Sequence, residues 1–268
     1  MIKLGIIYTS YGMPEYIVKS LLPWIKARRE YDIKIAGLNA QFKEYHEMGI
    51  VDNDTDSEYK LMIAYNKNLI DHLEIQRIDE GMDNVKYETE TQIRNRGLQF
   101  LLKQDCTHIL IWDGDEVISE EEIDNLFKYL DKEENQFTPI YKIEYKNLIN
   151  DENHYIRGFN PKRIWKVDLG EWKLSQVIYD NDFSYIYKLT GEPASDSNFA
   201  INQIPTNIIN PLHYSWLNNE RSKNKINYQL KRWGICSYKW NSQDNKVEFD
   251  YDFYRKNGLD LPVIYKDD

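Results

Sequence analysis

Short apolar runs alternate with amphipathic stretches over the first 130 residues, and this alternation constrains the possible folds more than any other feature of the sequence. The apolar runs predict strands at residues 2–8, 31–38, 73–78 and 108–112. The amphipathic stretches predict helices at residues 14–28, 57–69, 89–102 and 119–130. Capping boxes, Thr89 with Gln92 and Ser119 with Glu122, mark the starts of the last two helices. Strands and helices in alternation favour an α/β fold with a mainly parallel sheet covered on both faces.

The alternation of predicted strands and helices ends near residue 136. Short β-like segments without helices between them are predicted at residues 139–145, 162–167 and 183–189. A polar, turn-rich stretch at 191–205 predicts a loop or lid, and a last amphipathic helix is expected at 216–233. Because no internal repeat and no Gly/Ser linker divides the chain, we expect one domain over residues 1–235, with lobes at 1–131 and 132–235. Residues 236–268 then form a C-terminal extension.

The charge balance is acidic, with 44 Asp and Glu against 34 Lys and Arg and a formal net charge of −10. Extended nucleic-acid binding is disfavoured, because it needs an excess of positive charge on one face. Two basic segments are exceptions: Arg157, Lys162, Arg163 and Lys166, and Arg221, Lys223, Lys225, Lys231 and Arg232. Each could hold a small phosphorylated ligand or form a solvated charged face. The aromatic content of 14% likewise fits stacking on sugars or packing in a core.

No apolar run approaches the roughly 20 residues of a membrane span, and no cationic segment followed by an apolar stretch opens the chain. Cys106 and Cys236 lie far apart in the sequence and form no Cys-x-x-Cys motif. Reduced thiols are the default state of such cysteines in a cytoplasm. We therefore expect a cytoplasmic protein without a membrane span.

Asp113 and Asp115 directly follow the apolar run at 108–112. Ligands of an open α/β sheet bind at the carboxyl ends of its strands, so this pair lies at the expected crevice. Two carboxylates one residue apart in a turn can hold a hard divalent cation. Such a cation could bridge a diphosphate and neutralise the charge that grows as a phosphate leaves. The alternative is a simple turn, because Asp and Gly both favour turns.

Further motifs precede and follow Asp113 and Asp115 in the sequence. Arg94-Asn95 lies in the helix that precedes the strand, and residues 5–16 form the first strand and its turn. Further on come residues 159–165 (FNPKRIW) and 212–216 (LHYSW). The ordered set resembles glycosyltransferase family 2, in members with an Asp-x-Asp-Glu signature. The resemblance extends from residue 1 to about residue 235.

This resemblance implies a GT-A fold, with a nucleotide-sugar-binding lobe at 1–131 and an acceptor lobe at 132–235. It implies inverting transfer of a sugar from a nucleotide-diphosphate donor, with a UDP-sugar as the first expectation. Asp113 and Asp115 would hold Mn²⁺ or Mg²⁺, with His213 as a late histidine that completes the contacts. The implied donor contacts are Thr9, Ser10, Tyr11, Arg94, Asp113 and Lys225. A buried core histidine and a solvated helix face are the alternatives for His213 and Lys225.

Inverting transfer also needs a general base for the acceptor hydroxyl. Family members often carry a His-Glu pair after the Trp-containing strand, where this chain has Ser175-Gln176. A glutamine cannot act as a base at neutral pH. Glu171 and Asp168 lie nearby in the sequence and are the candidates, although either also fits a solvated turn.

Two alternatives compete with a glycosyltransferase. A haloacid-dehalogenase-type phosphatase would use Asp113 as nucleophile and Asp115 as acid/base. However, its motif usually sits on the first strand, and the later acidic pair that it needs is missing. A non-catalytic sugar- or nucleotide-binding module would keep the fold without the chemistry. The acceptor stays open among a glycan, a lipid-linked sugar, a protein side chain and a modified nucleic-acid base.

Overall fold

The computed structural model describes residues 1–10, 12–40, 55–76, 90–135, 138–179, 182–190, 192, 199–217 and 219–266. Within these ranges the side chains of residues 40, 90, 175–179, 182–184, 215, 219–221, 232 and 233 are not described. No helix in the described ranges is both long and apolar enough to cross a membrane.

A seven-stranded sheet forms the centre of the molecule, with strand order β13-β6-β9-β4-β1-β2-β3. Its strands are β1 (Lys3–Thr9), β2 (Asp32–Ala40), β3 (His72–Gln76), β4 (His108–Asp113), β6 (Ile140–Lys142), β9 (Lys162–Lys166) and β13 (Ile201–Gln203). β1 to β4 pair in parallel, whereas β9 runs antiparallel to both of its neighbours. The sheet is therefore mixed and mainly parallel, as the alternation of apolar runs predicts.

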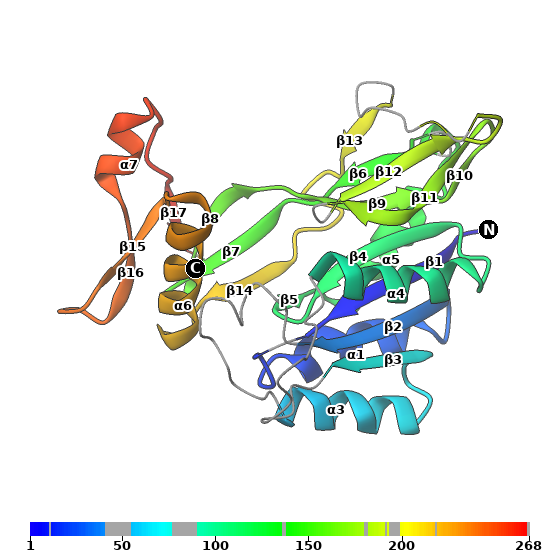
Figure 1. Cartoon of the computed structure of the whole chain (residues 1–268), viewed down its shortest axis with the longest axis horizontal. Helices are drawn as coiled ribbons and strands as arrows, with labels where there is room; N and C mark the ends of the chain where they lie inside the picture. Colours follow the sequence, from blue (N-terminus) through cyan, green and yellow to red (C-terminus); the bar gives the residue numbers. More distant parts are fainter. Residues whose placement is uncertain are drawn as a thin grey trace, which may run out of the picture.

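Helices cover both faces of this sheet (Figure 1). Within the described residues, the helices before β6 are α1 (Ile17–Ala27), α3 (Thr55–Asn66), α4 (Glu90–Leu102) and α5 (Glu120–Leu130), followed by a short 3₁₀ turn at Glu133–Asn135. α1, α3 and α5 share one apolar cluster with the sheet, and α4 belongs to the cluster on the other face. The α/β class is thus confirmed.

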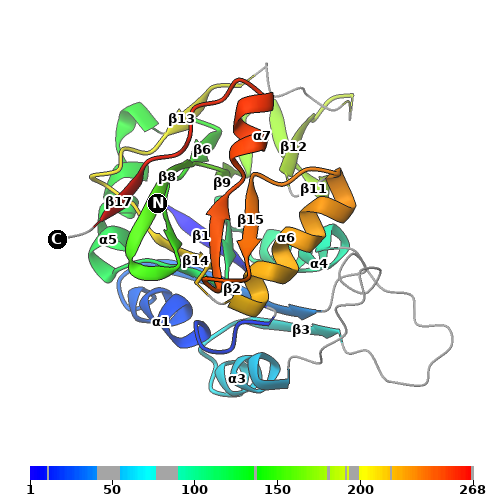
Figure 2. The ribbon, with the colours of Figure 1, turned by 90° about the vertical axis from the view of Figure 1, so that its left-hand side faces the viewer.

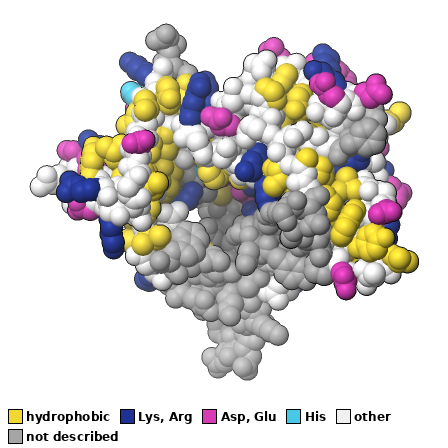
Figure 3. Space-filling view, turned by 90° about the horizontal axis from the view of Figure 1, so that it is seen from above, with side chains coloured by type: hydrophobic (Ala, Val, Ile, Leu, Met, Phe, Trp, Pro, Cys, Tyr) yellow, Lys and Arg dark blue, Asp and Glu magenta, His cyan; other side chains and the backbone are white. Residues whose placement is uncertain are grey.

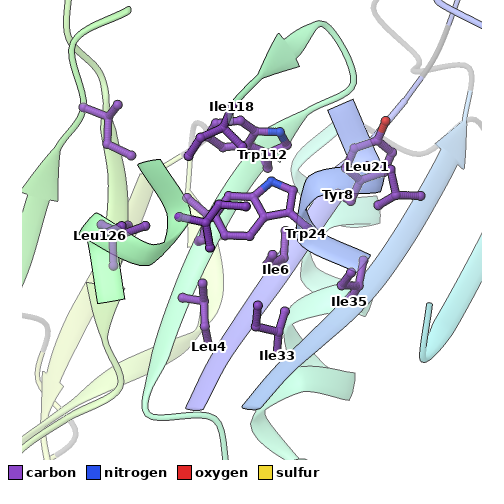
Figure 4. Packing of buried hydrophobic residues seen from close by; sticks show 14 of the residues in the cluster. Leu4, Ile6, Tyr8, Leu21, Trp24, Ile33, Ile35, Trp112, Ile118 and Leu126 are labelled. Atoms are coloured by element: carbon purple, nitrogen blue, oxygen red, sulfur yellow. The ribbon is translucent and has the colours of Figure 1, made fainter. Parts of the chain in front are cut away.

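Side chains alternate along the strands between these two clusters. On β1, Leu4, Ile6 and Tyr8 point to the face of α1, and Ile7 points to the face of α4. Trp24 of α1 packs edge-on against Trp112 of β4, with ring centroids 5.3 Å apart. Figure 4 shows these rings above the aliphatic side chains of β1 and β2. Strands apolar on both faces are what a sheet covered on both sides requires.

The capping box at Ser119 is confirmed. Its hydroxyl accepts a hydrogen bond from the Glu122 amide at 3.1 Å, and the Glu122 carboxylate accepts one from the Ser119 amide at 2.9 Å. Thr89, the cap predicted for α4, lies outside the described residues. These two bonds satisfy amide groups that a helix leaves without intrahelical partners, so they fix where α5 begins.

A second sheet with strand order β17-β8-β7-β14-β5 lies beside the first. Its strands are β5 (Glu116–Val117), β7 (Tyr145–Ile149), β8 (Asp151–Phe159), β14 (Leu212–Trp216) and β17 (Ile264–Lys266). A three-stranded sheet of β10 (Asp168–Leu169), β11 (Trp172–Tyr179) and β12 (Asp182–Tyr187) extends from the end of β9. After β14 come α6 (Asn219–Trp233), the hairpin of β15 (Tyr238–Asn241) and β16 (Lys246–Phe249), and α7 (Tyr251–Lys256). Figure 2 shows the hairpin beside α6.

The second half of the chain differs from the sequence-based expectations in three places. The predicted segment at 139–145 is divided between β6 and the first residue of β7, which belong to different sheets. The predicted helix at 216–233 begins only at Asn219, because Trp216 completes β14 and pairs with Ile149. The stretch at 191–205 includes β13, which pairs in parallel with β6, while much of the rest lies outside the described residues.

The C-terminal segment packs into the second sheet. Cys236, Val247, Phe249 and Tyr254 share an apolar cluster with Ile149, Ile156, Trp216 and Ile226. β17 pairs with β8 as an edge strand. The division into residues 1–131, 132–235 and 236–268 stays a prediction, and the structure places side chains from both sides of residue 235 in one core.

Candidate functional site

The turn after β4 lies at the carboxyl edge of the seven-stranded sheet. Asp113 is in register with Thr9 of β1, and the Gly114 amide donates to the Thr9 carbonyl at 2.7 Å. The Ser10 amide donates to the Leu38 carbonyl at 2.9 Å. These bonds bring the ends of β1, β2 and β4 together, where open α/β sheets bind their ligands.

Ser10 directly follows the last residue of β1. Its side chain is fully buried, and its carbonyl accepts a hydrogen bond from the Asn39 amide group at 2.8 Å. Within the described residues, its hydroxyl oxygen has no hydrogen-bond partner. Buried hydroxyls without partners are uncommon, and this one lies at the edge of the sheet where ligands are expected.

Asp113 is held by two arginines from different elements. Arg94 of α4 donates to Oδ1 at 2.6 Å, and Arg163 of β9 donates to Oδ2 at 3.1 Å. Both guanidinium groups are buried, whereas the Asp113 side chain is 24% exposed. Burial alone raises the pKa of Asp113, but the two guanidinium groups outweigh burial and hold this pKa below its usual value. Asp113 is therefore an ionised carboxylate with both oxygens engaged.

Glu116 is fully buried next to Asp113 and Arg163. Its carboxyl group contacts Arg163 and accepts hydrogen bonds from the Asp113 amide and the Tyr145 hydroxyl, both at 3.1 Å. Burial raises the pKa of Glu116 to about 8, although the Arg163 guanidinium opposes the shift. Glu116 thus positions Arg163, which in turn positions Asp113.

The sequence reasoning missed Glu116 and Tyr145, and it placed Arg163 only within a basic segment. One signal was available for Glu116, since the Asp-x-Asp-Glu signature includes it. For Arg163 the decisive fact is the antiparallel pairing of β9 with β4, in which Ile164 stands opposite Leu110. That pairing brings Arg163 toward the carboxyl end of β4, and sequence spacing does not reveal it.

Asp115 faces His213 across the junction of the two sheets. β5 and β14 pair antiparallel with His213 opposite Glu116, and His213 Nε2 lies 3.5 Å from Asp115 Oδ2. Both side chains are buried. The other ring nitrogen, Nδ1, lies 3.0 Å from Asn147 Oδ1. Burial lowers the pKa of His213, although the Asp115 carboxylate opposes the shift, so the neutral imidazole is favoured.

This pair fits a divalent cation. When Nδ1 donates its proton to the Asn147 oxygen, Nε2 presents a lone pair toward the Asp115 carboxylate, and a cation between the two relieves the repulsion. Carboxylate oxygens suit Mg²⁺ and Mn²⁺, and imidazole is a common metal ligand. No cluster of three or more His, Cys, Asp or Glu side chains arranged for a metal occurs in the described residues, so the remaining ligands would have to come from a bound molecule or water.

The structure brings most of the predicted donor and metal contacts to one place. Thr9, Ser10, Arg94, Asp113, Asp115 and His213 all lie at this edge. Tyr11 lies outside the described residues. Lys225 of α6 lies beside Trp216, with its Nζ 4.7 Å from the centre of the Trp216 ring. Lys225 and His213 line the same cavity.

Asp168 and Glu171, the two candidates for the general base, are placed elsewhere. β9 runs antiparallel to β4, so Lys166 stands opposite His108 at the amino end of β4. Both candidates follow Lys166 in the chain and lie beyond that end, at the opposite edge of the sheet from Asp113. Asp168 forms an exposed ion pair with Lys188 at 2.7 Å. The side chain of Gln176 is not among those described.

Comparisons with known proteins give limited likenesses. No protein-family model matches the chain. No curated protein matches it either. Among solved structures, S. aureus TarS residues 1–349 in complex with UDP-GlcNAc is 15% identical, with 62% of this chain and 45% of that chain covered and a TM-score of 0.38. The chain therefore spans less than half of that TarS fragment.

Two further structures are similar over part of their length. One is mannosyltransferase PcManGT from Pyrobaculum calidifontis in complex with GDP-Man and Mn²⁺. It is 9% identical, with a TM-score of 0.42, and the likeness covers 87% of this chain and 65% of that chain. A cytidylyltransferase from Leptospira borgpetersenii is 13% identical, with a TM-score of 0.32. The likeness covers 62% of this chain and 61% of that chain. All these TM-scores lie below 0.5, so the likeness is partial.

Proposed function

We propose that this chain is a metal-dependent glycosyltransferase of the GT-A type that takes its sugar from a nucleotide-diphosphate donor, with a UDP-sugar as the first candidate. The observation that carries the proposal is the buried Asp115–His213 pair beside Asp113, at the carboxyl ends of β1 and β4. An anionic donor needs positive charge at such an edge. A divalent cation on Asp115 and His213 would supply it, together with the buried Arg94 and Arg163.

Each residue of the site has a separate role in this proposal. Thr9 ends β1 and Ser10 follows it, and both lie beside the expected nucleoside. Asp115 and His213 would hold Mn²⁺ or Mg²⁺, which when bound neutralises charge on the departing diphosphate. Asp113, the third metal ligand that the resemblance implies, would have to share its carboxylate oxygens with Arg94 and Arg163. Arg94 and Arg163 hold Asp113 in a fixed, ionised state at the mouth of the site. Fixed charges of this kind stabilise developing charge without reorganising during the reaction.

The inverting course of the transfer comes from the family resemblance and needs a general base. Asp168 and Glu171 remain the residues that the sequence suggests for this role. Their place beyond the amino end of β4 gives that assignment no support. A phosphatase that uses Asp113 as nucleophile is disfavoured, because both of its carboxylate oxygens accept hydrogen bonds from guanidinium groups.

The first test measures nucleotide binding through thermal stability. UDP, GDP, CDP and dTDP are each added with Mn²⁺ or with EDTA. We expect one nucleotide to raise the melting temperature only with Mn²⁺, since a hundredfold excess over the dissociation constant adds about 2.7 kcal/mol to the free energy of unfolding. D115A and H213A should lose the Mn²⁺-dependent shift, and the exposed D131A is the matched control.

Three outcomes separate the possibilities. Equal shifts with Mn²⁺ and EDTA, or an unchanged shift in D115A, contradict the metal site. A Mn²⁺-dependent shift without slow release of nucleotide from any nucleotide-sugar indicates a binding module in place of an enzyme. Hydrolysis of phosphate esters without nucleotide binding would favour the phosphatase.

A further inference from the structure

Asn147 is a buried amide side chain beside His213. β7 and β14 pair in parallel with Asn147 aligned to His213, so the two side chains project from the same face of the second sheet. Their exposed fractions are 5% and 6%, and that of Asp115 is 2%. Charged side chains are spread over the surface, as Figure 3 shows for one face, whereas these three groups have little access to bulk water. Their polar atoms therefore depend on partners within the protein or on a bound ligand.

Neighbouring rings fix the orientation of the His213 imidazole. Phe159 at the end of β8 stacks on it, with ring centroids 5.0 Å apart and an interplanar angle of 13°. Tyr145 of β7 lies at a centroid distance of 5.9 Å, with its ring inclined by 59°. Because these contacts limit rotation of the ring, the main freedom that remains is which nitrogen carries the proton of the neutral imidazole.

The two tautomers differ in what they offer to a cation. With the proton on Nδ1, Nε2 presents its lone pair toward Asp115, and with the proton on Nε2 that lone pair is lost to a metal. Nδ1 lies 3.0 Å from Asn147 Oδ1, within the range of about 2.7–3.2 Å that is normal for an N–H···O hydrogen bond. Nε2 lies 3.5 Å from Asp115 Oδ2, outside that range. The distances therefore favour the proton on Nδ1.

We propose that Asn147 is a positioning residue of the metal site. Its side-chain oxygen holds the proton of His213 on Nδ1, so that the Nε2 lone pair faces Asp115 and the cation between them. The inference rests on the proposed function, which assigns Asp115 and His213 to the metal. Asn147 itself contacts neither the cation nor the donor in this arrangement, and it acts only through the imidazole.

The first measurement is made on the full chain without metal. In a chain labelled with ¹⁵N-histidine, the chemical shifts of the two ring nitrogens show which of them carries the proton. We expect the proton on Nδ1 of His213 in the unaltered chain, and on Nε2 in N147L, whose side chain has a similar size and no acceptor. N202L is the matched control. Asn202 is half-buried on β13, at an edge of the seven-stranded sheet, and donates to the Thr138 hydroxyl at 2.9 Å.

The second measurement is a titration of the same chains with Mn²⁺, followed through the electron paramagnetic resonance of the unbound ion. Loss of the outer partner of a metal-binding histidine typically lowers metal affinity about 10–100-fold, and we expect a loss in this range in N147L. Mg²⁺, measured by competition with Mn²⁺, should lose less, because it prefers oxygen ligands. N147D retains an acceptor oxygen and should recover most of the Mn²⁺ affinity. N202L should bind Mn²⁺ as the unaltered chain does.

Two results overturn the inference and leave the proposed function intact. One is a proton on Nε2 of His213 in the unaltered chain, or the same tautomer in N147L as in the unaltered chain. The other is equal Mn²⁺ affinity in N147L and the unaltered chain, with both binding nucleotide in a Mn²⁺-dependent way. By contrast, an Asn147-dependent tautomer in a chain that binds no Mn²⁺ would refute the metal site of the proposed function while confirming that Asn147 sets the tautomer.

Discussion

His108 and His213 are two buried histidines with different surroundings. Burial lowers the pKa of both. His213 faces Asp115 at one nitrogen and Asn147 at the other, within the candidate site. His108 begins β4 at the opposite end of the sheet, where its Nδ1 lies 3.0 Å from the Thr107 hydroxyl. At the residue scale, His108 is therefore a structural residue whose titration should be visible in stability alone.

Burial, with a smaller contribution from Lys166, lowers the pKa of His108 to about 4. The unfolded chain binds a proton near pH 6.5, and the folded chain does so only near pH 4, so stability falls as the pH falls between these values. At about 1.4 kcal/mol per pKa unit, the loss from this group has an upper bound of about 3.5 kcal/mol. Urea unfolding at pH 7, 5.5 and 4.5 measures it. H108Q should flatten the dependence between pH 6.5 and pH 4.

The residues of the site could be predicted where they are close in sequence or follow a strand. Asp113 and Asp115 needed only the apolar run before them and the rule that strand ends carry ligands. Arg163 and Tyr145 could not be predicted in the same way, because each reaches the site through a pairing between distant strands. Asp168 and Glu171 illustrate the converse: they are near Arg163 in sequence, yet the direction of β9 carries them away from the site.

At the scale of elements, the turn after β4 is packed closely against the end of β1. A Cβ atom on Gly114 would lie 3.0 Å from Met13 Sδ and 3.0 Å from both Cβ and Oγ of Ser10. Contacts this short require the Met13 and Ser10 side chains, or the turn itself, to shift by a few tenths of an ångström. The absence of a side chain at Gly114 therefore sets the distance between Ser10 and the carboxylates of the turn.

We expect Gly114→Ala to lower the free energy of unfolding by about 1–3 kcal/mol, as other overpacked sites do. It should also weaken Mn²⁺-dependent nucleotide binding, because Ser10 shifts relative to Asp115. Gly97→Ala in α4 is the matched control, since its Cβ would meet Ala36 and Leu38 at an ordinary 3.4 Å and alanine favours a helix. Thermal unfolding measures the change in stability, and titration with nucleotide and Mn²⁺ measures the change in affinity. Unchanged nucleotide affinity in G114A would show that the turn tolerates the movement.

The elements of the first half were predictable because each has a clear period and local end signals, such as the capping box at Ser119. The second half lacks such signals. Residues 140–149 switch sheets within a few positions, and β14 depends on neighbours from β5 and β7. Those neighbours are close in space and distant in sequence, so local patterns carry little information about the pairing.

At the scale of the whole molecule, the C-terminal segment completes the second sheet's core. Val247, Phe249 and Tyr254 bury their side chains against Ile156 and Trp216. The last residues contribute less, because Leu259, Leu261, Val263, Ile264 and Tyr265 are all at least 39% exposed. The cooperative unit of folding should therefore extend past residue 235 but need not include the last ten residues.

Removal of residues 236–268 should lower the melting temperature markedly and broaden the transition, because it uncovers Trp216 and its apolar neighbours. Removal of residues 259–268 alone should have a much smaller effect. Differential scanning calorimetry of the two truncated chains and the full chain provides the comparison. Equal melting temperatures for the full chain and residues 1–235 would instead establish the extension as a separate unit.

The placement of His213 on an interior strand has a consequence for how the site meets its ligand. β14 is paired on both edges, and the Tyr214 amide donates to the Asp115 carbonyl at 2.9 Å, so the strand and the Asp115 turn are joined through the backbone. Amide protons here should exchange with solvent only when the sheet itself opens. If a cation binds here as proposed, it would find Asp115 and His213 already in place, and its affinity would lose little to the entropy of ordering them.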